Sequence, residues 1–166
     1  MTGTTGTTAH LIHDLEVTRD ATLAFFQLGE RELEKTYATG KWSVKFLLHH
    51  LADSETVLNE RIRRVLSEPT QTLMVFDQDA WAAALDYSRM PLDISRDIFA
   101  GVRKGIIHLA RLHYEPHGHL TFIHSTMGER TLSEEFEKVA AHNAKHLGDI
   151  RAALDRDEVG YLGSRE

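Results

Sequence analysis

The segment Ser43-VKFLLHHLADSETVLNERIRRV-Leu66 has the clearest periodicity in the chain. Its apolar residues recur at steps of three, four and seven, which places them on one face of an α-helix. They are Val44, Leu47, Leu48, Leu51, Leu58, Ile62 and Val65. Ser43 is a suitable N-cap, and Glu68-Pro69 stops the pattern. The segment therefore predicts a long amphipathic helix from Val44 to Leu66.

Three further segments have helical spacing of apolar residues, and we expect helices over 10–28, 93–114 and 132–155. Thr131 and Glu134 match a capping box at the start of the last helix. We expect short helical pieces within 30–35 and 77–85, and a loop or brief extended piece over 120–130. Four long helices with almost no strand signal predict an all-α antiparallel bundle.

Between the second and third long helices lie about 26 residues, which exceeds a simple bundle loop. We therefore expect a crossover or a functional segment there. The Thr- and Gly-rich residues 1–8 predict a flexible leader, 9–155 one domain, and 156–166 a flexible tail.

The composition excludes several classes of protein. The chain has 166 residues and a net charge of −6, the wrong sign for a surface that binds a nucleic-acid backbone. It has no cysteine, and therefore neither a disulfide framework nor a thiolate metal site. It also lacks an apolar run of the roughly 20 residues that span a bilayer. The first eight residues have neither a basic start nor an apolar stretch, so we do not expect them to form a signal peptide. We expect a cytoplasmic protein that binds neither membranes nor nucleic acid.

Histidine is the unusual residue, with 11 copies. His142 and His146 are four residues apart on the last predicted helix, so their rings share one face with Cβ atoms roughly 5–6 Å apart. Two such imidazoles either bind one metal ion or are core histidines bonded to carboxylates. A third metal ligand would come from His49 or His50. Periodicity does not choose between them, and we expect one of the two to face solvent.

The remaining histidines give weaker signals. His117 and His119 alternate with glycine in a predicted loop, where exposure is the more common explanation than a metal site. His10 and His13 are expected at the surface.

Three motifs together resemble the DinB-like superfamily. They are GKWSVKFLLHHLADSE at 40–55, HSTMGERTL at 124–132 and HNAKHLGDI at 142–150. Their order and separations also match those of the family, so the resemblance covers roughly residues 10–155. Asp77 and Trp81 match an Asp-x-x-x-Trp element of the YfiT-like subgroup, a segment that lies over the pocket or contributes to the core.

The resemblance implies a four-helix bundle with an up-down-down-up arrangement and a long crossover between helices 2 and 3, often dimeric. It also implies a divalent metal held by three histidines, which map onto His50, His142 and His146. His50 is chosen over His49 because the family's first ligand directly precedes Leu or Val. Where the family usually has Gln, this chain has Asp149, which would orient a ligand histidine or join the metal.

Three imidazoles with an open coordination position suit a catalytic ion, with zinc or nickel favoured and iron or manganese possible. We expect a metal-dependent homodimeric enzyme that acts as a thiol S-transferase or hydrolase on a small molecule, with a low-molecular-weight thiol as a candidate partner. His124, Asp149 and Arg61 are candidates to shape the open side, and no general base is identified. The alternatives are a non-catalytic, stress-associated metal-binding bundle and a bundle whose inward histidines are hydrogen-bonded without metal.

Overall fold

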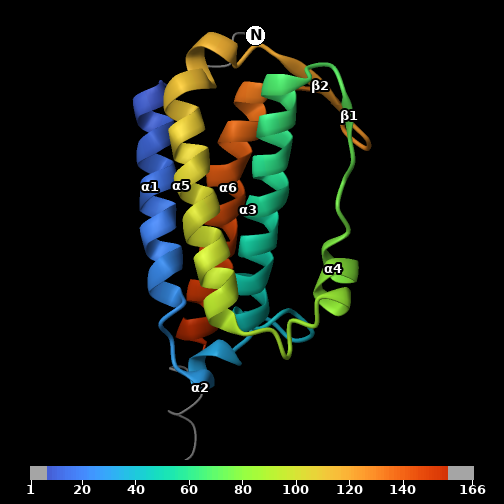
Figure 1. The fold of residues 1–166 in the computed structure, drawn as a ribbon. Helices are drawn as coiled ribbons and strands as arrows, with labels where there is room; N and C mark the ends of the chain where they lie inside the picture. The colour runs from blue at the N-terminus through green and yellow to red at the C-terminus, as the bar shows by residue number, and fades with distance from the viewer. Residues whose placement is uncertain (1–6, 157–166) are drawn as a thin grey trace, which may run out of the picture.

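A computed structural model describes residues 7–156 of the chain as a bundle of four long helices. These are α1 (Thr8–Phe25), α3 (Val44–Ser67), α5 (Leu92–His117) and α6 (Leu132–Asp155). Figure 1 shows α1 and α6 running in one direction and α3 and α5 in the other. This arrangement confirms the predicted up-down-down-up bundle, with the crossover between α3 and α5.

Two short helices and a small sheet complete the fold. The helices are α2 (Glu30–Leu33) and α4 (Gln78–Ala84), and the strands are β1 (Thr72–Leu73), β2 (Thr121–His124) and β3 (Gly128–Thr131). The order is β1-β2-β3, with β1 parallel and β3 antiparallel to β2. β2 and β3 lie where a loop or a brief extended piece was expected, at 120–130. β1 was not expected, because a strand of two residues is too short to show alternation.

The helix termini follow local capping chemistry. The side chain of Ser43 caps α3, and Thr131 and Glu134 form the predicted capping box of α6. Thr7 caps α1 and Thr8 begins it, so these two residues of the predicted leader belong to the helix. Residues 1–6 and 157–166, which hold the rest of the predicted leader and nearly all of the predicted tail, lie outside the described residues.

The helix predicted to end at Tyr114 continues to His117, with Pro116 inside its last turn. Proline removes one backbone N–H donor, and in an exposed last turn the carbonyl that loses this donor remains accessible to water. The predicted end of this helix is therefore about one turn too early.

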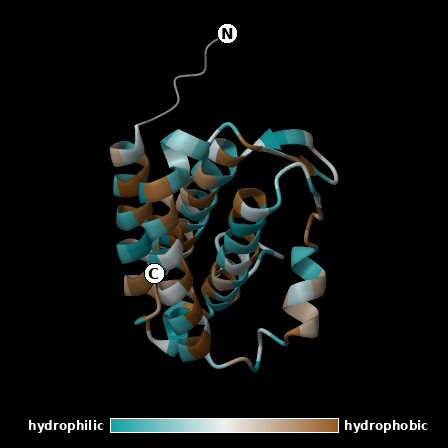
Figure 2. Cartoon of the chain, turned by 45° about the horizontal axis from the view of Figure 1, so that its top comes forward, coloured by the Kyte–Doolittle hydropathy of each residue, from teal (hydrophilic) through white to brown (hydrophobic). Residues whose placement is uncertain are grey.

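Apolar side chains from all four long helices form the core. Figure 2 shows hydrophobic (brown) and hydrophilic (teal) residues within each of these helices, as expected for amphipathic segments. One cluster, which includes Leu15, Ile62 and Phe136, lies in the half next to the sheet; the other, which includes Leu48 and Phe99, lies towards α2. The candidate metal ligands His50, His142 and His146 lie on α3 and α6.

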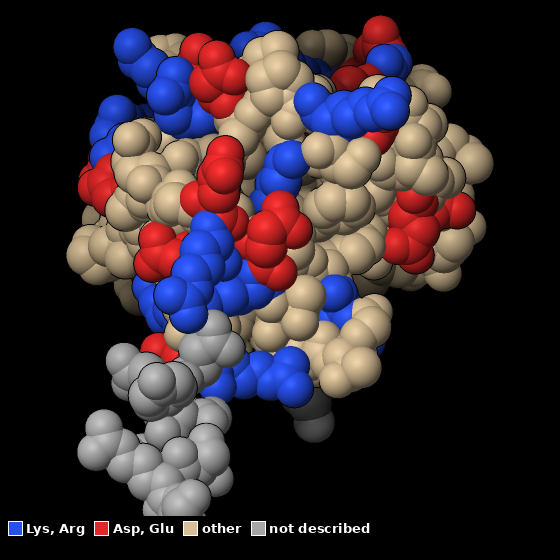
Figure 3. All heavy atoms as spheres, turned by 90° about the horizontal axis from the view of Figure 1, so that it is seen from below, with Lys and Arg blue, Asp and Glu red and all other residues tan. Residues whose placement is uncertain are grey.

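None of the helices within residues 7–156 is both long and apolar enough to cross a membrane. Figure 3 shows Lys and Arg side chains next to Asp and Glu side chains over the lower end of the molecule. Mixed charge on this face does not form the single-sign basic surface that phosphate binding favours.

Candidate metal centre

Helices α3 and α6 bring His50, His142 and His146 together. One ring nitrogen from each histidine lies within 4.8 Å of the others. The Nε2 atoms of His50 and His142 are 3.2 Å apart, and the ring of His146 is centred 4.9 Å from that of His50 and 4.6 Å from that of His142. Among residues 7–156, this is the one group of three or more potential ligands that converges in this way.

The two adjacent histidines of α3 point to different neighbours. His50 faces α6, whereas the Nδ1 of His49 lies 2.7 Å from the Ser95 hydroxyl on α5. The Nε2 of His49 is buried without a hydrogen-bond partner. Burial of His49 also contradicts the expectation that one of the pair would face solvent, since both rings are almost fully buried.

Asp149 contacts the triad through His146. Its Oδ2 lies 3.1 Å from the Nδ1 of His146 and 3.0 Å from the Nζ of Lys145. A proton on Nδ1 donated to this carboxylate leaves the Nε2 of His146 free to bind a metal, a common arrangement around metal-bound histidine. Of the two roles expected for Asp149, the geometry matches the one in which it orients a ligand.

The triad is held in its neutral form. Burial, reinforced by the neighbouring His146, lowers the pKa of His142 to about 3, and burial lowers that of His50 to about 3. Burial also lowers the pKa of His146, although its hydrogen bond to Asp149 opposes the shift. Neutral imidazole is the form that binds metal ions, so these rings can act as ligands without first losing a proton near neutral pH.

Aromatic side chains enclose His50. The ring of Trp42 packs edge-on against the His50 ring, with 5.2 Å between the ring centroids. The ring of Phe76 stacks on the His50 ring, with 6.0 Å between the centroids. Trp81 of α4 in turn contacts Phe76, at 5.1 Å between ring centroids. The segment that carries the Asp-x-x-x-Trp element therefore lies over the triad, as the resemblance suggested. Trp81 covers the triad indirectly, by packing against Phe76.

A cleft of about 330 Å³ opens beside His146. Its polar side chains come from three separate parts of the chain, the loop before α3, the start of α4, and α6. They include Tyr37, Lys41, Gln78, Asp79 and Lys145. These residues were not among the predicted site residues, because only the tertiary arrangement brings them to one cleft.

Two residues expected to shape the open side lie elsewhere. Arg61 is 11 residues beyond His50 on α3, about 16 Å along the helix axis. It donates to the Met74 carbonyl at 2.5 Å and forms an ion pair with Glu135. His124 is buried on β2 and contacts the Thr126 hydroxyl. The contacts of Arg61 with Met74 and Glu135 attach the crossover segment to the bundle.

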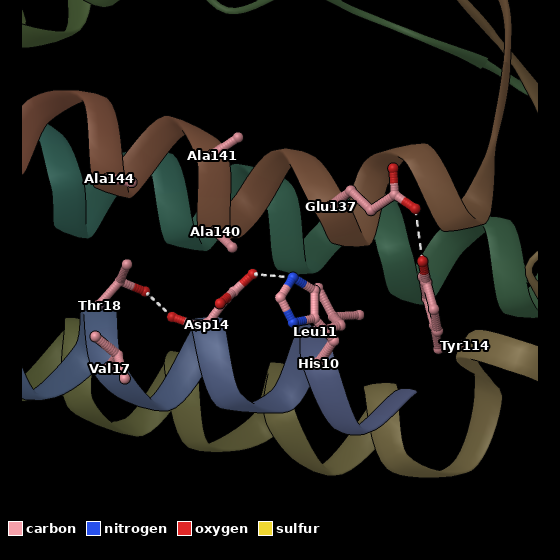
Figure 4. Close-up of a pocket in the computed structure, with 10 residues that line it drawn as sticks. All are labelled: His10, Leu11, Asp14, Val17, Thr18, Tyr114, Glu137, Ala140, Ala141 and Ala144. Atoms are coloured by element: carbon pink, nitrogen blue, oxygen red, sulfur yellow. Dashed lines mark hydrogen bonds and ion pairs between the residues drawn. The ribbon is translucent and has the colours of Figure 1, made fainter. Parts of the chain in front are cut away.

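The other predicted features fall outside the triad. His117 lies with its Nδ1 3.0 Å from that of His113, so it pairs along α5 and not with His119. His10 and His13 are exposed, as expected. A separate cleft of about 490 Å³ between α1 and α6 is lined by alanines of α6 and by His10, whose Nε2 lies 3.4 Å from the Oδ2 of Asp14 (Figure 4).

The donor set fits a divalent ion. Bonds of about 2.0–2.1 Å to histidine nitrogen place two ligands of a tetrahedral ion roughly 3.3 Å apart. The 3.2 Å between the Nε2 atoms of His50 and His142 agrees with this spacing. The free Nε2 of His146 supplies a third donor from the same face of α6.

Known proteins share this fold and sequence pattern. The sequence model of the DinB superfamily matches residues 14–150. A protein of Oceanobacillus iheyensis named "putative metal-dependent hydrolase" is 32% identical over 130 residues, which cover 78% of this chain and 75% of that protein. A Bacillus cereus protein with the same description is 26% identical over 141 residues, covering 85% and 81%.

A solved structure also matches. YfiT from Bacillus subtilis, described as "a probable metal-dependent hydrolase with an unusual four-helix bundle topology", superposes with a TM-score of 0.83 at 22% identity. The match covers 91% of this chain and 87% of YfiT. The chain belongs to the DinB superfamily.

Proposed function

We propose that this protein is a divalent-metal-dependent enzyme in which His50, His142 and His146 hold the ion. The observation that carries the proposal is the convergence of three neutral imidazole nitrogens within 4.8 Å of one another. The description of its relatives as metal-dependent hydrolases supports the same chemistry.

An ion held by three imidazoles is a Lewis acid with open coordination positions, and it lowers the pKa of bound water or of a bound thiol. The protein residues position and shield it. Asp149 holds the proton on the Nδ1 of His146, and Phe76 and Trp42 keep water from the faces of His50. The polar cleft beside His146 is the route by which a small-molecule substrate reaches the ion.

Hydrolysis is the reaction that the names of the relatives favour. Thiol S-transfer, with a low-molecular-weight thiol as the second substrate, is favoured by a different observation. Asp149, the carboxylate that contacts the triad, is already bonded to His146 and Lys145 and is therefore a poor general base. A thiol bound to such an ion would be deprotonated outright, whereas bound water would be only partly deprotonated near neutral pH, so S-transfer depends less on a general base.

Metal analysis tests the ligand set. Protein purified without an affinity tag should contain one divalent ion per chain, and elemental analysis would identify zinc, nickel, iron or manganese. We expect His146→Ala to lose this ion and His49→Ala to keep it, because the side chain of His49 contacts α5 and Tyr87. Equal metal loss in both variants, with folding verified by circular dichroism, would contradict the assignment of His50.

Activity assays separate the two reactions. The metal-loaded protein would be tested on aryl esters and amides for hydrolysis, and on an electrophile with glutathione, bacillithiol or mycothiol for S-transfer. Activity in either panel should disappear in His146→Ala. Stoichiometric metal with no turnover in both panels would instead support a non-catalytic metal-binding protein. A homodimer, and a location in the cytoplasm, remain part of this proposal, and gel filtration with light scattering tests the former.

A further inference from the structure

A buried polar layer crosses the bundle next to the triad and joins all four long helices. Its centre is Arg103 of α5, whose side chain is fully buried. The guanidinium forms a two-pronged ion pair with Glu55 of α3 and donates to the Asn143 Oδ1 of α6 at 3.2 Å. Its remaining N–H groups donate to the Leu15 carbonyl and the Thr18 hydroxyl of α1.

Every N–H group of Arg103 therefore has an acceptor. Nε and one Nη2 hydrogen bond to Glu55, the other Nη2 hydrogen bonds to Asn143, and both Nη1 hydrogens bond to α1. Asn143 in turn donates to the Thr22 hydroxyl at 3.0 Å. Such a layer is satisfied in only one alignment of the helices, because sliding a helix by one residue moves its groups 1.5 Å along the axis and turns them by 100°.

A buried ion pair adds little net stability, because the desolvation of both charges offsets their attraction. Apolar residues of similar volume are often equally stabilising or more so. The better-supported use of a buried polar group is to select one alignment over others that are nearly as stable. The layer is therefore better explained by the alignment of the helices than by their stability.

The layer and the triad occupy adjacent positions on the same two helices. Glu55 directly follows Ser54, whose hydroxyl lies 3.3 Å from the Nε2 of His50, and Asn143 directly follows His142. We propose that Arg103 is a positioning residue for the metal centre, which fixes α3 and α6 in the alignment that brings His50 to His142. This inference deepens the proposed function and rests on it for its metal readout.

The test replaces the ion pair with apolar residues. The double variant Arg103→Met with Glu55→Leu should keep its helical circular dichroism and melt within a few degrees of the wild type, or above it. It should nevertheless bind Zn²⁺ at least 10-fold more weakly in a chelator competition, as expected when the support of a ligand is lost. Its Co²⁺ complex should show an altered visible absorption spectrum, which reports the coordination geometry.

Ile106→Ala is the matched control. Ile106 lies one turn beyond Arg103 on α5, is fully buried, and belongs to the apolar core. This variant should lose stability but keep the Co²⁺ spectrum and the Zn²⁺ affinity. Wild-type metal binding in the double variant, or an equal loss of affinity in Ile106→Ala, would overturn the proposal.

A metal-free measurement separates this proposal from the proposed function. The chain has no cysteine, so spin labels can be attached at Thr56→Cys on α3 and Ala144→Cys on α6, both exposed. Pulsed electron resonance should give one narrow distance distribution with Arg103 and Glu55 intact, and a shifted or broadened one in the double variant. An unchanged distribution would refute the alignment role. A wild-type protein that binds neither Zn²⁺ nor Co²⁺ would instead refute the proposed function.

Discussion

Acidification of the metal-free protein should destabilise it through the buried histidines. Burial lowers the pKa of His50 and of His142 to about 3, whereas an unfolded histidine titrates near 6.5. A lowered pKa in the folded state means that the unfolded chain binds more protons. The stabilising contribution is therefore complete above about pH 6.5 and is lost as the pH falls toward 3.

The size of the effect follows from the same pKa values. At pH 5 the unfolded form of each histidine is almost fully protonated and the folded form is neutral, which costs about 2 kcal/mol per residue. His50 and His142 together account for about 4 kcal/mol. His49, whose pKa burial lowers to about 4, adds a similar amount. The sum is comparable to the whole stability of an ordinary domain, about 5–15 kcal/mol.

Urea unfolding at pH 7.5 and pH 5.0, in the presence of a chelator, measures this loss. The variant His50→Leu should lose about 2 kcal/mol less than the wild type between the two pH values. His13→Leu is the control, because His13 is exposed and its loss should leave the pH dependence unchanged. Carboxyls such as Glu55, whose pKa burial raises, are common to all three proteins and cancel in the comparison. Identical pH dependence in His50→Leu and the wild type would refute the reasoning.

Three further outcomes are expected. Asp149→Asn should weaken Zn²⁺ binding about 10–100-fold in a chelator competition, because it removes the anionic partner of His146, and an unchanged affinity would exclude that role. Phe76→Ala should lower the free energy of unfolding by about 1–2 kcal/mol, less than a fully buried phenylalanine, and a neutral result in urea titration would mean that Phe76 does not cover His50. Zinc at 100 times its dissociation constant should stabilise the wild type by about 2.7 kcal/mol in calorimetry, and the same gain in His146→Ala would place the ion elsewhere.

The four long helices could be predicted from the sequence because each has a continuous apolar stripe and clear caps. Ser43 and the pair Thr131 and Glu134 begin their helices as expected. The sequence allowed an extended piece near β2 and β3, but the pairing of the small sheet could not be predicted, because β1 has two residues and pairs with a strand about fifty positions later. Such pairing depends on the packing of the bundle and leaves no local pattern.

The sequence placed two candidate ligands on α6 by spacing alone, but the third required the family resemblance. Periodicity left His49 and His50 equivalent, and the structure separates them because α3 packs against both α5 and α6. The predicted position of Arg61 at the open side of the metal site was wrong for a related reason. Arg61 shares a face of α3 with His50, but residues on one helix face can lie far apart along the helix axis. Arg61 lies about three turns from His50.

The wide separation of the three histidines along the chain bears on how the protein is made in the cell. His50 emerges from the ribosome 92 residues before His142, and His146 follows four residues after that. During synthesis, an incomplete chain that stops short of α6 carries at most one of the three donors. Under the proposed ligand set, an ion can be bound by all three donors only after α6 has been synthesised, and a product truncated before α6 would fail to retain it.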